Sequence, residues 1–547
     1  MMVATIFSRL LGFVREAAMG YFWGGRSPHT DAFWAAFGVP DLFYYVLSGG
    51  AFGAAVIPVF AGYLHRGEEE EGWRAANTLL TLFLLCAAAA VALIMVFARP
   101  LVMMIVAPGF AKHPNQVAEC VGYVHIIAPM VLLTVTSGLM TGFLQSYRHF
   151  TAPAVAWAVY NFGIIGGVFF GGLAINSFRG DPAGLRGPAF GVLVGGALLV
   201  LAQFPALLAR GFRFRPALEL RHPGVRETLR LFFPYMVALA ATQVCLLWLP
   251  IPFGSHFTGG VTSLRYANRL VILPYGLFAI AISTAAFPAM AERVAAQEIG
   301  EFRKLVSNSL RAVLFLAIPS AAGLAVLAGP ILRLLWKRGD LDETAVAMST
   351  FSLIFFAGSL IGLSGLQILN RAFFSLKDRM TPPVLAIVYN GLIVLIAFVL
   401  IRTPLRYAAV AVAVSIGTIV GMLGMLELLR RRIGGVDGRE ILLSVLRMSV
   451  AGGALAAVAY VAMRWSGAVL DVPSTTFGLV APLAAEVVPN IATPKLAVGL
   501  QVLISMAAGV AAYLVVLRLL GSPEIDSFRE IWRRRRAARS AEPVTVE

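Results

Sequence analysis

Apolar runs of about 20 residues recur from end to end of the chain, separated by short polar segments. About 20 apolar residues in a helix cross the ~30 Å hydrocarbon core of a bilayer, whereas a membrane barrel shows alternating segments of about ten residues. The pattern therefore predicts an all-α polytopic membrane protein with about 14 transmembrane helices. Their expected extents are 2–22, 31–62, 75–98, 118–146, 152–176, 186–208, 229–250, 262–290, 305–328, 348–375, 382–401, 406–429, 442–463 and 497–519.

Composition agrees with this class. Of 547 residues, 59% are hydrophobic and 13% are charged, against about 25% charged in soluble domains. The net charge of +16 does not indicate nucleic acid, because no basic face is interleaved with exposed aromatics. Cys86, Cys120 and Cys245 have no metal-binding spacing and are expected to be buried thiols, so no metal site is predicted. No small-residue cleavage site follows the first apolar segment, so no cleavable signal peptide is expected.

The basic residues favour one orientation. Alternate connections are rich in arginine, which is typical of cytoplasmic loops. Both termini are therefore expected in the cytoplasm, with the basic tail close to anionic membrane lipids. The richest connections carry Arg66 and Arg74, Arg210 to Arg226, Arg430 to Arg432, and Arg533 to Arg536.

An internal repeat predicts two related bundles. SYRHFTAPAVAWAVYN (146–161) matches SLKDRMTPPVLAIVYN (375–390) without gaps. The spacing implies a six-helix unit, and two such bundles with a site between them are typical of transporters that rock for alternating access. The expected division is a first lobe at 1–210, a second lobe at 225–432, two further helices within 440–520, and a basic tail at 521–547.

The first helix carries charges at bilayer depth. Ser8, Gly12 and Arg15 share one stripe, and Arg9 and Glu16 form the neighbouring stripe. Intramembrane charges are costly and mark functional sites by default. Guanidinium groups stay protonated and match phosphate oxygens bidentately, so a lipid-linked phosphate is the expected ligand. The alternative is that these arginines are structural and are neutralised by acids of the first two helices.

A second pair of arginines lies in SLRYANRLVILPYG. Arg265 and Arg269 are one turn apart, with Pro274 below them. Arg265 is expected near the external end, where it can snorkel. Arg269 is deeper and is expected to be a third phosphate contact that faces the first helix.

The second helix contains Pro40 and Asp41 in its middle and opens with Asp31. A mid-helix proline frees a carbonyl and kinks the helix, either as a gating bend or as a static kink. Asp31 is expected to cap the start of its own helix and is also a candidate for the external gate.

Asn161 and Asn390 are polar residues at related positions of the repeat. Interhelical hydrogen bonds are the default role, and a coupling-ion site at Asn390 is the alternative. The sequence contains no Gly-rich phosphate loop, HExxH or G-x-S-x-G motif, so neither hydrolysis, ATP use nor a cofactor is indicated, and the protein is not expected to be an enzyme.

Several stretches together resemble the MurJ (MviN) family of lipid II flippases, in the multidrug/oligosaccharidyl-lipid/polysaccharide exporter superfamily. They are FSRLLGFVREA, TDAFWAAFGVPDLF, GGAFGAAVIPVF, VAPGF (106–110), YANRLVILPYGLFAIAI and RAFFSLKDRMTPP (371–383). The resemblance implies two six-helix lobes and two C-terminal helices that form a groove for the lipid tail. It also implies export of lipid II, an undecaprenyl-pyrophosphate-linked peptidoglycan precursor, across the bacterial cytoplasmic (inner) membrane.

The resemblance also implies site residues. The pyrophosphate-binding positions of the family match Ser8, Arg9, Arg15 and Arg269, and its gate aspartate matches Asp31. The sodium site of some members is partly matched, by Asn390. The sequence departs from the family pattern at Asp41, Tyr44, Gly49 and Asn268, which affects the expected gate and one cationic contact.

Two other functions stay open from the sequence. The first is a related exporter of another polyprenyl-linked glycan or of a small-molecule drug. A drug antiporter is expected to place acids at the centre of its cavity, whereas this chain places arginines there. The second is a membrane scaffold, which has no need of a polar cavity between two repeated bundles.

Overall fold

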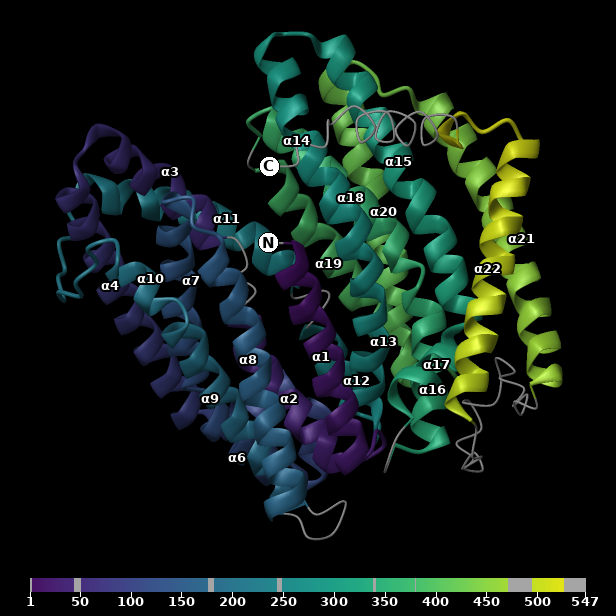
Figure 1. Cartoon of the computed structure of the whole chain (residues 1–547), viewed down its shortest axis with the longest axis horizontal. Coiled ribbons are helices and arrows are strands. Elements are labelled where there is room, and N and C mark those ends of the chain that lie inside the picture. Colours follow the sequence, from purple (N-terminus) through teal and green to yellow (C-terminus); the bar gives the residue numbers. More distant parts are fainter. Residues whose placement is uncertain are drawn as a thin grey trace, which may run out of the picture.

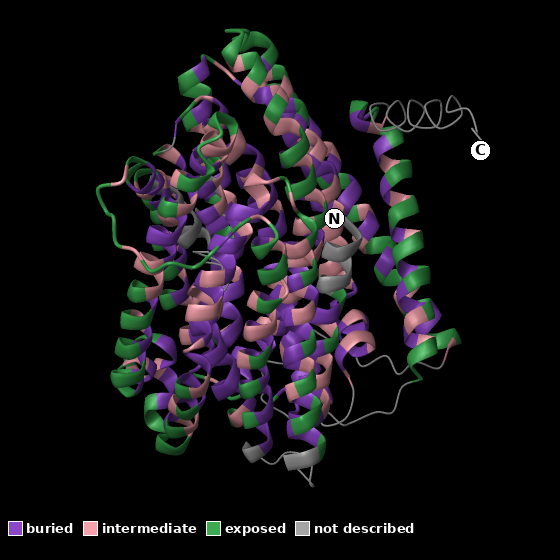
Figure 2. Ribbon diagram, turned by 60° about the vertical axis from the view of Figure 1, so that its left-hand side comes forward, coloured by how far each residue is buried: buried purple, intermediate pink, exposed green. Residues whose placement is uncertain are grey.

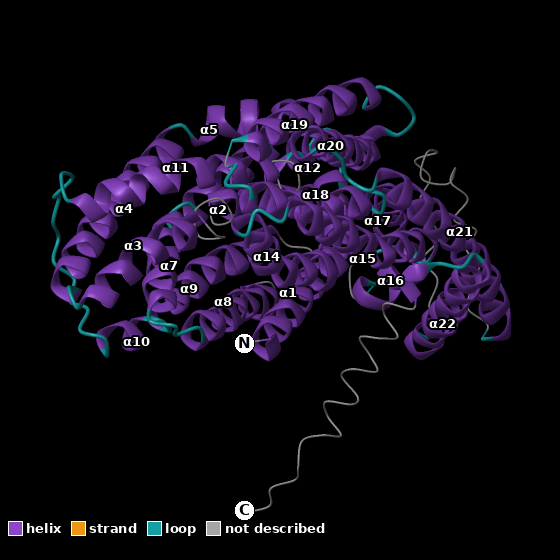
Figure 3. Cartoon of the chain, turned by 90° about the horizontal axis from the view of Figure 1, so that it is seen from above, coloured by secondary structure: helices purple, strands orange, loops and turns teal. Residues whose placement is uncertain are grey.

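The computed structural model describes residues 2–43, 51–175, 182–243, 248–337, 341–378, 380–470 and 494–525. In these ranges the chain forms helices and no strand, and the helices run roughly side by side (Figures 1 and 3). Each of the fourteen predicted stretches overlaps a helix or a pair of helices. Ten helical segments in the described ranges are long and apolar enough to span a membrane, or eleven if a pair bent by 44° counts as one span. The chain is therefore a multi-pass membrane protein, and the count of fourteen stays a prediction.

The helices of the first half end before the connection at residues 209–222. They are α1 (Met2–Trp23), α2 (Pro28–Phe43), α3 (Ala51–Arg66), α4 (Glu69–Val96), α5 (Ala98–Leu101), α6 (Pro114–Ile127), α7 (Met130–Ser146), α8 (Thr151–Phe170), α9 (Arg186–Leu201) and α10 (Phe204–Leu208), with short 3₁₀ or π turns at Val102–Val106, Pro108–Lys112, Gly171–Ile175 and Pro182–Leu185.

The second half follows the same plan and is extended by a helical pair at its far edge (Figure 1). Its helices are α11 (Pro223–Gln243), α12 (Pro250–Gly254), α13 (Gly260–Pro274), α14 (Ile280–Ala295), α15 (Ile299–Val326), α16 (Ala328–Trp336), α17 (Glu343–Phe356), α18 (Ser359–Ser375), α19 (Thr381–Leu400), α20 (Ala409–Ile433), α21 (Gly438–Val469) and α22 (Lys495–Leu519), with a π turn at Tyr275–Ala279 and a 3₁₀ turn at Arg406–Ala408.

Helix α1 lies between two large apolar cores. One core is built from residues between Met19 and Val261, and the other from residues between Leu249 and Leu517. Phe22 of α1 belongs to the first core, whereas Phe13 packs against the second. Apolar side chains on the outer faces are exposed, as expected for surface that faces lipid (Figure 2). The lobe boundaries at 210 and 225 stay a prediction.

The internal repeat is confirmed by its backbone. Helix α7 ends at Ser146 and α18 ends at Ser375, the first residues of the two matched segments. Two residues later, Arg148 and Lys377 both adopt left-handed backbone angles, with φ of 58° and 59°. Non-glycine residues rarely adopt this region, so the shared conformation identifies the same turn in both copies.

The helices after these turns also pack alike. An added Cβ at Gly195 of α9 would lie 2.6 Å from the carbonyl oxygen of Tyr160 on α8. An added Cβ at Gly421 of α20 would lie 2.7 Å from the ring of Tyr389 on α19. Glycine lets each pair of helices approach closely, as is common between membrane helices.

The segment that joins the two halves lies against α4. The side-chain amide of Asn77 donates to the carbonyl oxygen of Arg213 at 3.1 Å and accepts from the N–H of Arg215 at 3.0 Å. One side chain thereby satisfies backbone groups that a loop would otherwise leave to water.

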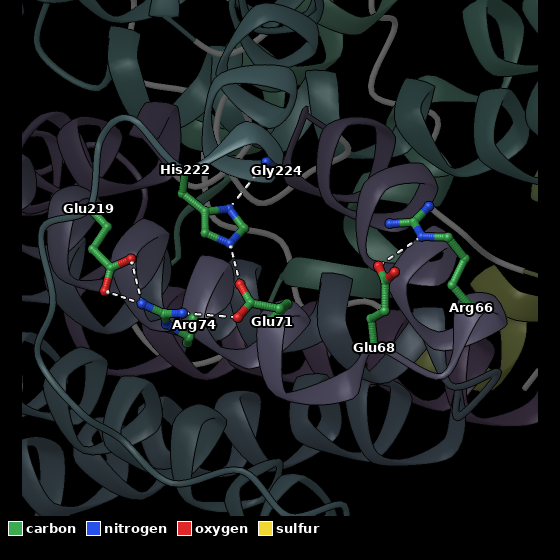
Figure 4. Close-up of polar contacts among 7 residues, drawn as sticks. All are labelled: Arg66, Glu68, Glu71, Arg74, Glu219, His222 and Gly224. Carbon is green, nitrogen blue, oxygen red and sulfur yellow. Dashed lines mark hydrogen bonds and ion pairs between the residues drawn. The ribbon is translucent and has the colours of Figure 1, made fainter.

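Ion pairs continue this attachment (Figure 4). Arg74 of α4 pairs with Glu219 at 3.2 Å. The N–H of Gly224 donates to Nδ1 of His222 at 3.2 Å, so Nε2 carries the hydrogen and donates to Glu71 at 3.1 Å. The start of α11 is therefore tied to the first half of the molecule.

Candidate functional site: an arginine cluster between the halves

Helices α1 and α13 meet through charged side chains. Arg15 and Glu16 lie on α1, and Arg265 and Arg269 lie one turn apart on α13. Gly12 makes the approach close, because an added Cβ there would lie 2.5 Å from a terminal nitrogen of Arg269. The glycine in the first-helix stripe thus provides the space for an arginine from the other half.

One carboxylate oxygen forms ion pairs with all three guanidinium groups. Oε1 of Glu16 lies 3.3 Å from Arg15, 3.6 Å from Nε of Arg265 and 3.6 Å from Nε of Arg269. Asp41 of α2 adds a further ion pair to Arg265 at 3.7 Å. Three positive and two negative side chains leave one positive charge in excess. The Glu16 side chain is fully buried, so it is screened little by water.

Arg265 is held between aromatic rings of α2. Its guanidinium carbon lies 4.0 Å from the centroid of Trp34 and 5.0 Å from that of Phe37. The expectation that Arg265 snorkels is wrong, since its side chain is 17% exposed and forms ion pairs, and its expected place near the external end stays a prediction. The aromatic faces and the two acids together stabilise this largely buried guanidinium.

Two donors of the cluster are unsatisfied. The Nε atoms of Arg15 and Arg265 are buried and make no hydrogen bond within the described residues, although Nε of Arg265 is ion-paired with Glu16 at 3.6 Å. A buried donor without an acceptor costs about 1–3 kcal/mol. An anionic ligand that enters the cluster would therefore find two donors that make no hydrogen bond without it.

Asp31 joins the halves at one end of this cluster. Its carboxylate accepts hydrogen bonds from the N–H of Gly259 at 2.6 Å and from the N–H and hydroxyl of Thr262 at 2.9 and 2.6 Å. Gly259 precedes α13, so Asp31 caps a helix of the other half and not its own helix. Asp31 therefore acts as an N-terminal cap, as expected. The expectation that the capped helix is α2 is wrong, because the capped helix is α13.

Gly109 makes a second close contact between the two halves at the same end. The N–H of Gly109 donates to the hydroxyl of Ser255 at 2.9 Å. An added Cβ at Gly109 would lie 2.3 Å from the backbone of Ser255, so only glycine permits this contact. The VAPGF motif therefore brings a turn of the first half directly onto the connection that leads into α13.

Besides Asp31, four of the predicted site residues lie in described parts of this region. Arg15 and Arg269 belong to the cluster, Asp41 pairs with Arg265, and Pro40 is buried in α2. The side chains of the predicted site residues Ser8 and Arg9 lie outside the described part of the structure, and so do the whole residues Tyr44 and Gly49. Asn390 is buried in α19, next in sequence to Tyr389, whose ring packs against Gly421 of α20.

The sequence reasoning missed the role of two residues. Glu16 was expected only as a possible counter-ion of its neighbours, and it is the centre of the cluster. Arg265 was expected only to snorkel near the external end. The available signal was the i, i+4 spacing of Arg265 and Arg269, which places both side chains on one face of α13. In the described ranges no group of three or more His, Cys, Asp or Glu side chains could hold a metal ion.

Comparison with known proteins gives a consistent result. A family model described as "Lipid II flippase MurJ" matches residues 22–477. The chain belongs to the MurJ family. It is 29% identical to the probable lipid II flippase MurJ of Rhizobium meliloti (strain 1021), over 98% of this chain and 96% of that protein. It is 27% identical to the lipid II flippase MurJ of Burkholderia cenocepacia, over 78% and 82% of the two chains.

Solved structures share the fold. A structure of lipid II flippase MurJ in an inward closed conformation superposes with a TM-score of 0.74 at 21% identity, covering 96% of this chain and 99% of that one. An inward-facing multidrug resistance transporter of the MATE family superposes with a TM-score of 0.63 at 14% identity, over 79% and 96% of the chains. The predicted all-α architecture and the family resemblance are confirmed.

Proposed function

We propose that this protein is a lipid II flippase that moves its substrate from the cytoplasmic to the outer leaflet by alternating access. The observation that carries the proposal is the buried cluster in which Arg15 of α1 and Arg265 and Arg269 of α13 share the Glu16 carboxylate. The membership in the MurJ family supports the choice of lipid II as the cargo.

The chemistry of the cluster suits a diphosphate. Planar guanidinium forks bind phosphate oxygens bidentately and stay charged at any physiological pH. Glu16 holds them together while no cargo is bound, at separations of 3.3 to 3.6 Å. A diphosphate would compete with Glu16 for the same donors. Ser8 and Arg9 lie about two turns before Arg15 on α1, and we place them in the proposed site as well.

We place the gate at one end of the arginine cluster, where the two halves of the chain are in contact. Asp31 and Gly109 of the first half contact the segment before and at the start of α13. In the proposed cycle these contacts close the external side and break when the two lobes, 1–210 and 225–432, rock apart. Pro40 and Asp41 lie on the same helix as Asp31 and would move with it. Asn390 is the proposed position for a coupling ion.

The proposed location is the bacterial cytoplasmic membrane, with both termini in the cytoplasm. In this orientation the connection that carries Arg213 and Arg215 lies on the cytoplasmic side, as the distribution of basic residues favours. The protein acts as a transporter without catalytic residues or a cofactor. The cluster favours an anionic cargo, so a related polyprenyl-linked glycan is the second candidate and a drug cation is disfavoured.

Depletion of the protein followed by leaflet-resolved measurement of lipid II tests the proposal. Lipid II is expected to accumulate on the cytoplasmic side only, and an unchanged distribution would contradict the function. Complementation with Arg15→Ala or Arg269→Ala is expected to fail although each variant inserts at normal levels. Arg439→Ala, at an exposed arginine, serves as the matched control.

A further inference from the structure

The connection between the two halves combines positive charge with exposed apolar side chains. We call residues 209–222 the strap; it follows α10, leads into α11 and runs along the outer edge of the molecule beside α4 (Figures 1 and 3). The strap contains four arginines and one glutamate, an excess of three positive charges. Three of its large apolar side chains are nonetheless exposed, namely Phe214 at 46%, Leu218 at 55% and Leu220 at 48%.

Hydrogen bonds from α4 fix the height of the strap along that helix. Asn77 bonds to the strap backbone as described above, and the hydroxyl of Thr81 accepts from the N–H of Ala217 at 3.3 Å. Asn77 and Thr81 lie eight and twelve residues after Glu69, the first residue of α4, which is about 12 and 18 Å along the helix axis. The largely apolar run of α4 begins between them, at Leu79. The strap therefore crosses α4 where its polar first turns give way to apolar residues.

Aromatic rings at the start of the strap are typical of a membrane interface. Trp73 of α4 stacks on Tyr147 at 6.0 Å between ring centroids, and Phe212 of the strap lies 5.4 Å from Trp73. The guanidinium carbon of Arg210 lies 5.7 Å from the centroid of Tyr147. Trp and Tyr are enriched at the level of the lipid head groups, because their rings are apolar and their N–H and O–H groups are polar. The strap thus begins among residues that favour head-group depth.

The charges of the strap are available to a ligand. Arg213, Arg215 and Arg221 are exposed and form no ion pair with any residue that the structure describes. The acid of the strap, Glu219, is instead paired with Arg74 of α4 at 3.2 Å. Exposed guanidinium groups without a carboxylate partner can bind phosphate oxygens bidentately.

We propose that the strap binds the head groups of anionic phospholipids in the membrane around the protein. Its arginines match the lipid phosphates, and Phe214 and Leu218 belong to the part of the strap that α4 holds at the start of its apolar run, where acyl chains begin. A segment that had only to stay in water would not need large apolar side chains between its arginines. The inference uses only the multi-pass membrane character of the chain and does not depend on the proposed function.

The strap leads into a helix that contacts both halves. Helix α11 packs against α3 of the first half and α19 of the second. At the end of the strap, His222 bonds to Glu71 of α4 at 3.1 Å. Lipids bound to the strap would therefore hold the junction of the two halves at a fixed depth in the membrane.

Photocrosslinking in the full chain tests the assignment. The photoreactive residue p-benzoylphenylalanine takes the place of Phe214 in the strap or of Leu93 on the exposed face of α4. Each protein is reconstituted in phosphatidylcholine nanodiscs with a trace of radiolabelled phosphatidylglycerol or of radiolabelled phosphatidylcholine. At Phe214 the anionic lipid is expected to label about fivefold more than the zwitterionic lipid, because arginines near a surface attract anionic head groups. At Leu93 the two lipids should label equally.

Arginine variants test whether the charges of the strap cause this preference. Replacing the three unpaired arginines of the strap together by glutamine should lower labelling of the Phe214 probe by phosphatidylglycerol to the level of phosphatidylcholine. The matched control is Arg430→Gln with Arg431→Gln, since these arginines are also exposed but are paired with Glu427. The control should leave the preference at Phe214 unchanged.

Three results would overturn the proposal. Equal labelling of the Phe214 probe by both lipids would mean that the strap contacts bulk lipid without selecting its charge. No labelling by either lipid would indicate that the strap faces water and is open to a soluble partner. An equal loss of preference in the strap variant and in the Arg430 and Arg431 control would assign the attraction to the net charge of the protein and not to the strap.

Discussion

The carboxylate of Asp31 on α2 accepts two hydrogen bonds from Thr262 on α13, one from its backbone N–H at 2.9 Å and one from its hydroxyl at 2.6 Å. The two residues are 231 positions apart and lie in different halves of the chain. An N-terminal cap is ordinarily a local device within one helix. Here it joins two helices that must separate if the molecule opens at this end.

Removing this cap is expected to favour the opened state. Asp31→Ala should shift the equilibrium by about 2 kcal/mol, close to 30-fold, since a cap contributes about 0.5–2 kcal/mol and bonds to a charged acceptor are at the upper end. The measurement is the thiol-labelling rate of a cysteine at Ile251, which is buried against Gly38 of α2, in a protein whose native cysteines are replaced by serine.

A cap within one helix provides the control for this experiment. Asp342 accepts from the N–H of Ala345 at 2.8 Å at the start of its own helix, α17. Asp342→Ala should lower stability by a similar amount and leave labelling at Ile251 unchanged. Equal acceleration by both variants would mean that the Asp31 bonds stabilise the fold without closing the external side.

Gly12→Ala tests the approach of the two halves. Its Cβ would lie 2.5 Å from a terminal nitrogen of Arg269, so the guanidinium beside Glu16 must shift. Transport of lipid II should fall at least tenfold while the protein still inserts, because a guanidinium displaced by about 1 Å loses a bidentate geometry. Gly166→Ala on α8 is the control, since an added Cβ there meets nothing within 4 Å. Normal transport by Gly12→Ala would show that the position of Arg269 is not critical.

Arg265→Lys tests whether transport needs the planar guanidinium of Arg265 or only its positive charge. The ammonium keeps the positive charge but cannot stack as a plane on Trp34 or present a fork to a phosphate. A loss of at least tenfold in transport is expected at unchanged expression. Arg402 also lies over an aromatic ring, at 5.0 Å from Phe398, but it is exposed, so Arg402→Lys should behave like the wild type. Full activity of Arg265→Lys would show that transport needs only the positive charge at this position.

The lowered pKa of the Asp378 carboxyl makes the free energy of unfolding depend on pH. Burial raises the pKa of its carboxyl, but hydrogen bonds from Thr381 and Met380 and the charge of Arg432 outweigh this, so the pKa lies below its ordinary value of 3.8. A carboxyl with a lowered pKa stabilises the folded state above its ordinary pKa and loses this contribution as the pH falls through the folded value.

The thermal unfolding midpoint in detergent measures this effect. Asp378→Asn should lower stability by about 1 kcal/mol near neutral pH, and its difference from the wild type should shrink below pH 3.8. Asp437→Asn is the control, because Asp437 precedes α21 without making a side-chain cap. A difference between wild type and Asp378→Asn that stays constant down to pH 3 would contradict the assigned role.

The sequence by itself determined the class, the helices and the repeat. Each span needs about 20 apolar residues and internal backbone bonding, so a length rule locates it without knowledge of its neighbours. The match between 146–161 and 375–390 predicted the paired turns, where Arg148 and Lys377 share a left-handed conformation. Motif resemblance identified the family and brought Arg15, Arg269 and Asp31 forward as site residues.

Only the tertiary structure decided which charges meet. Glu16 and Arg265 acquired their roles because α13 lies beside α1, and no periodicity in the sequence specifies that contact. Asp31 was expected to cap the helix that it begins, since local capping is common, yet its partners lie 228 and 231 positions away. Long-range pairing of buried charges depends on how two bundles dock, and that is set by the whole interface rather than by a local pattern.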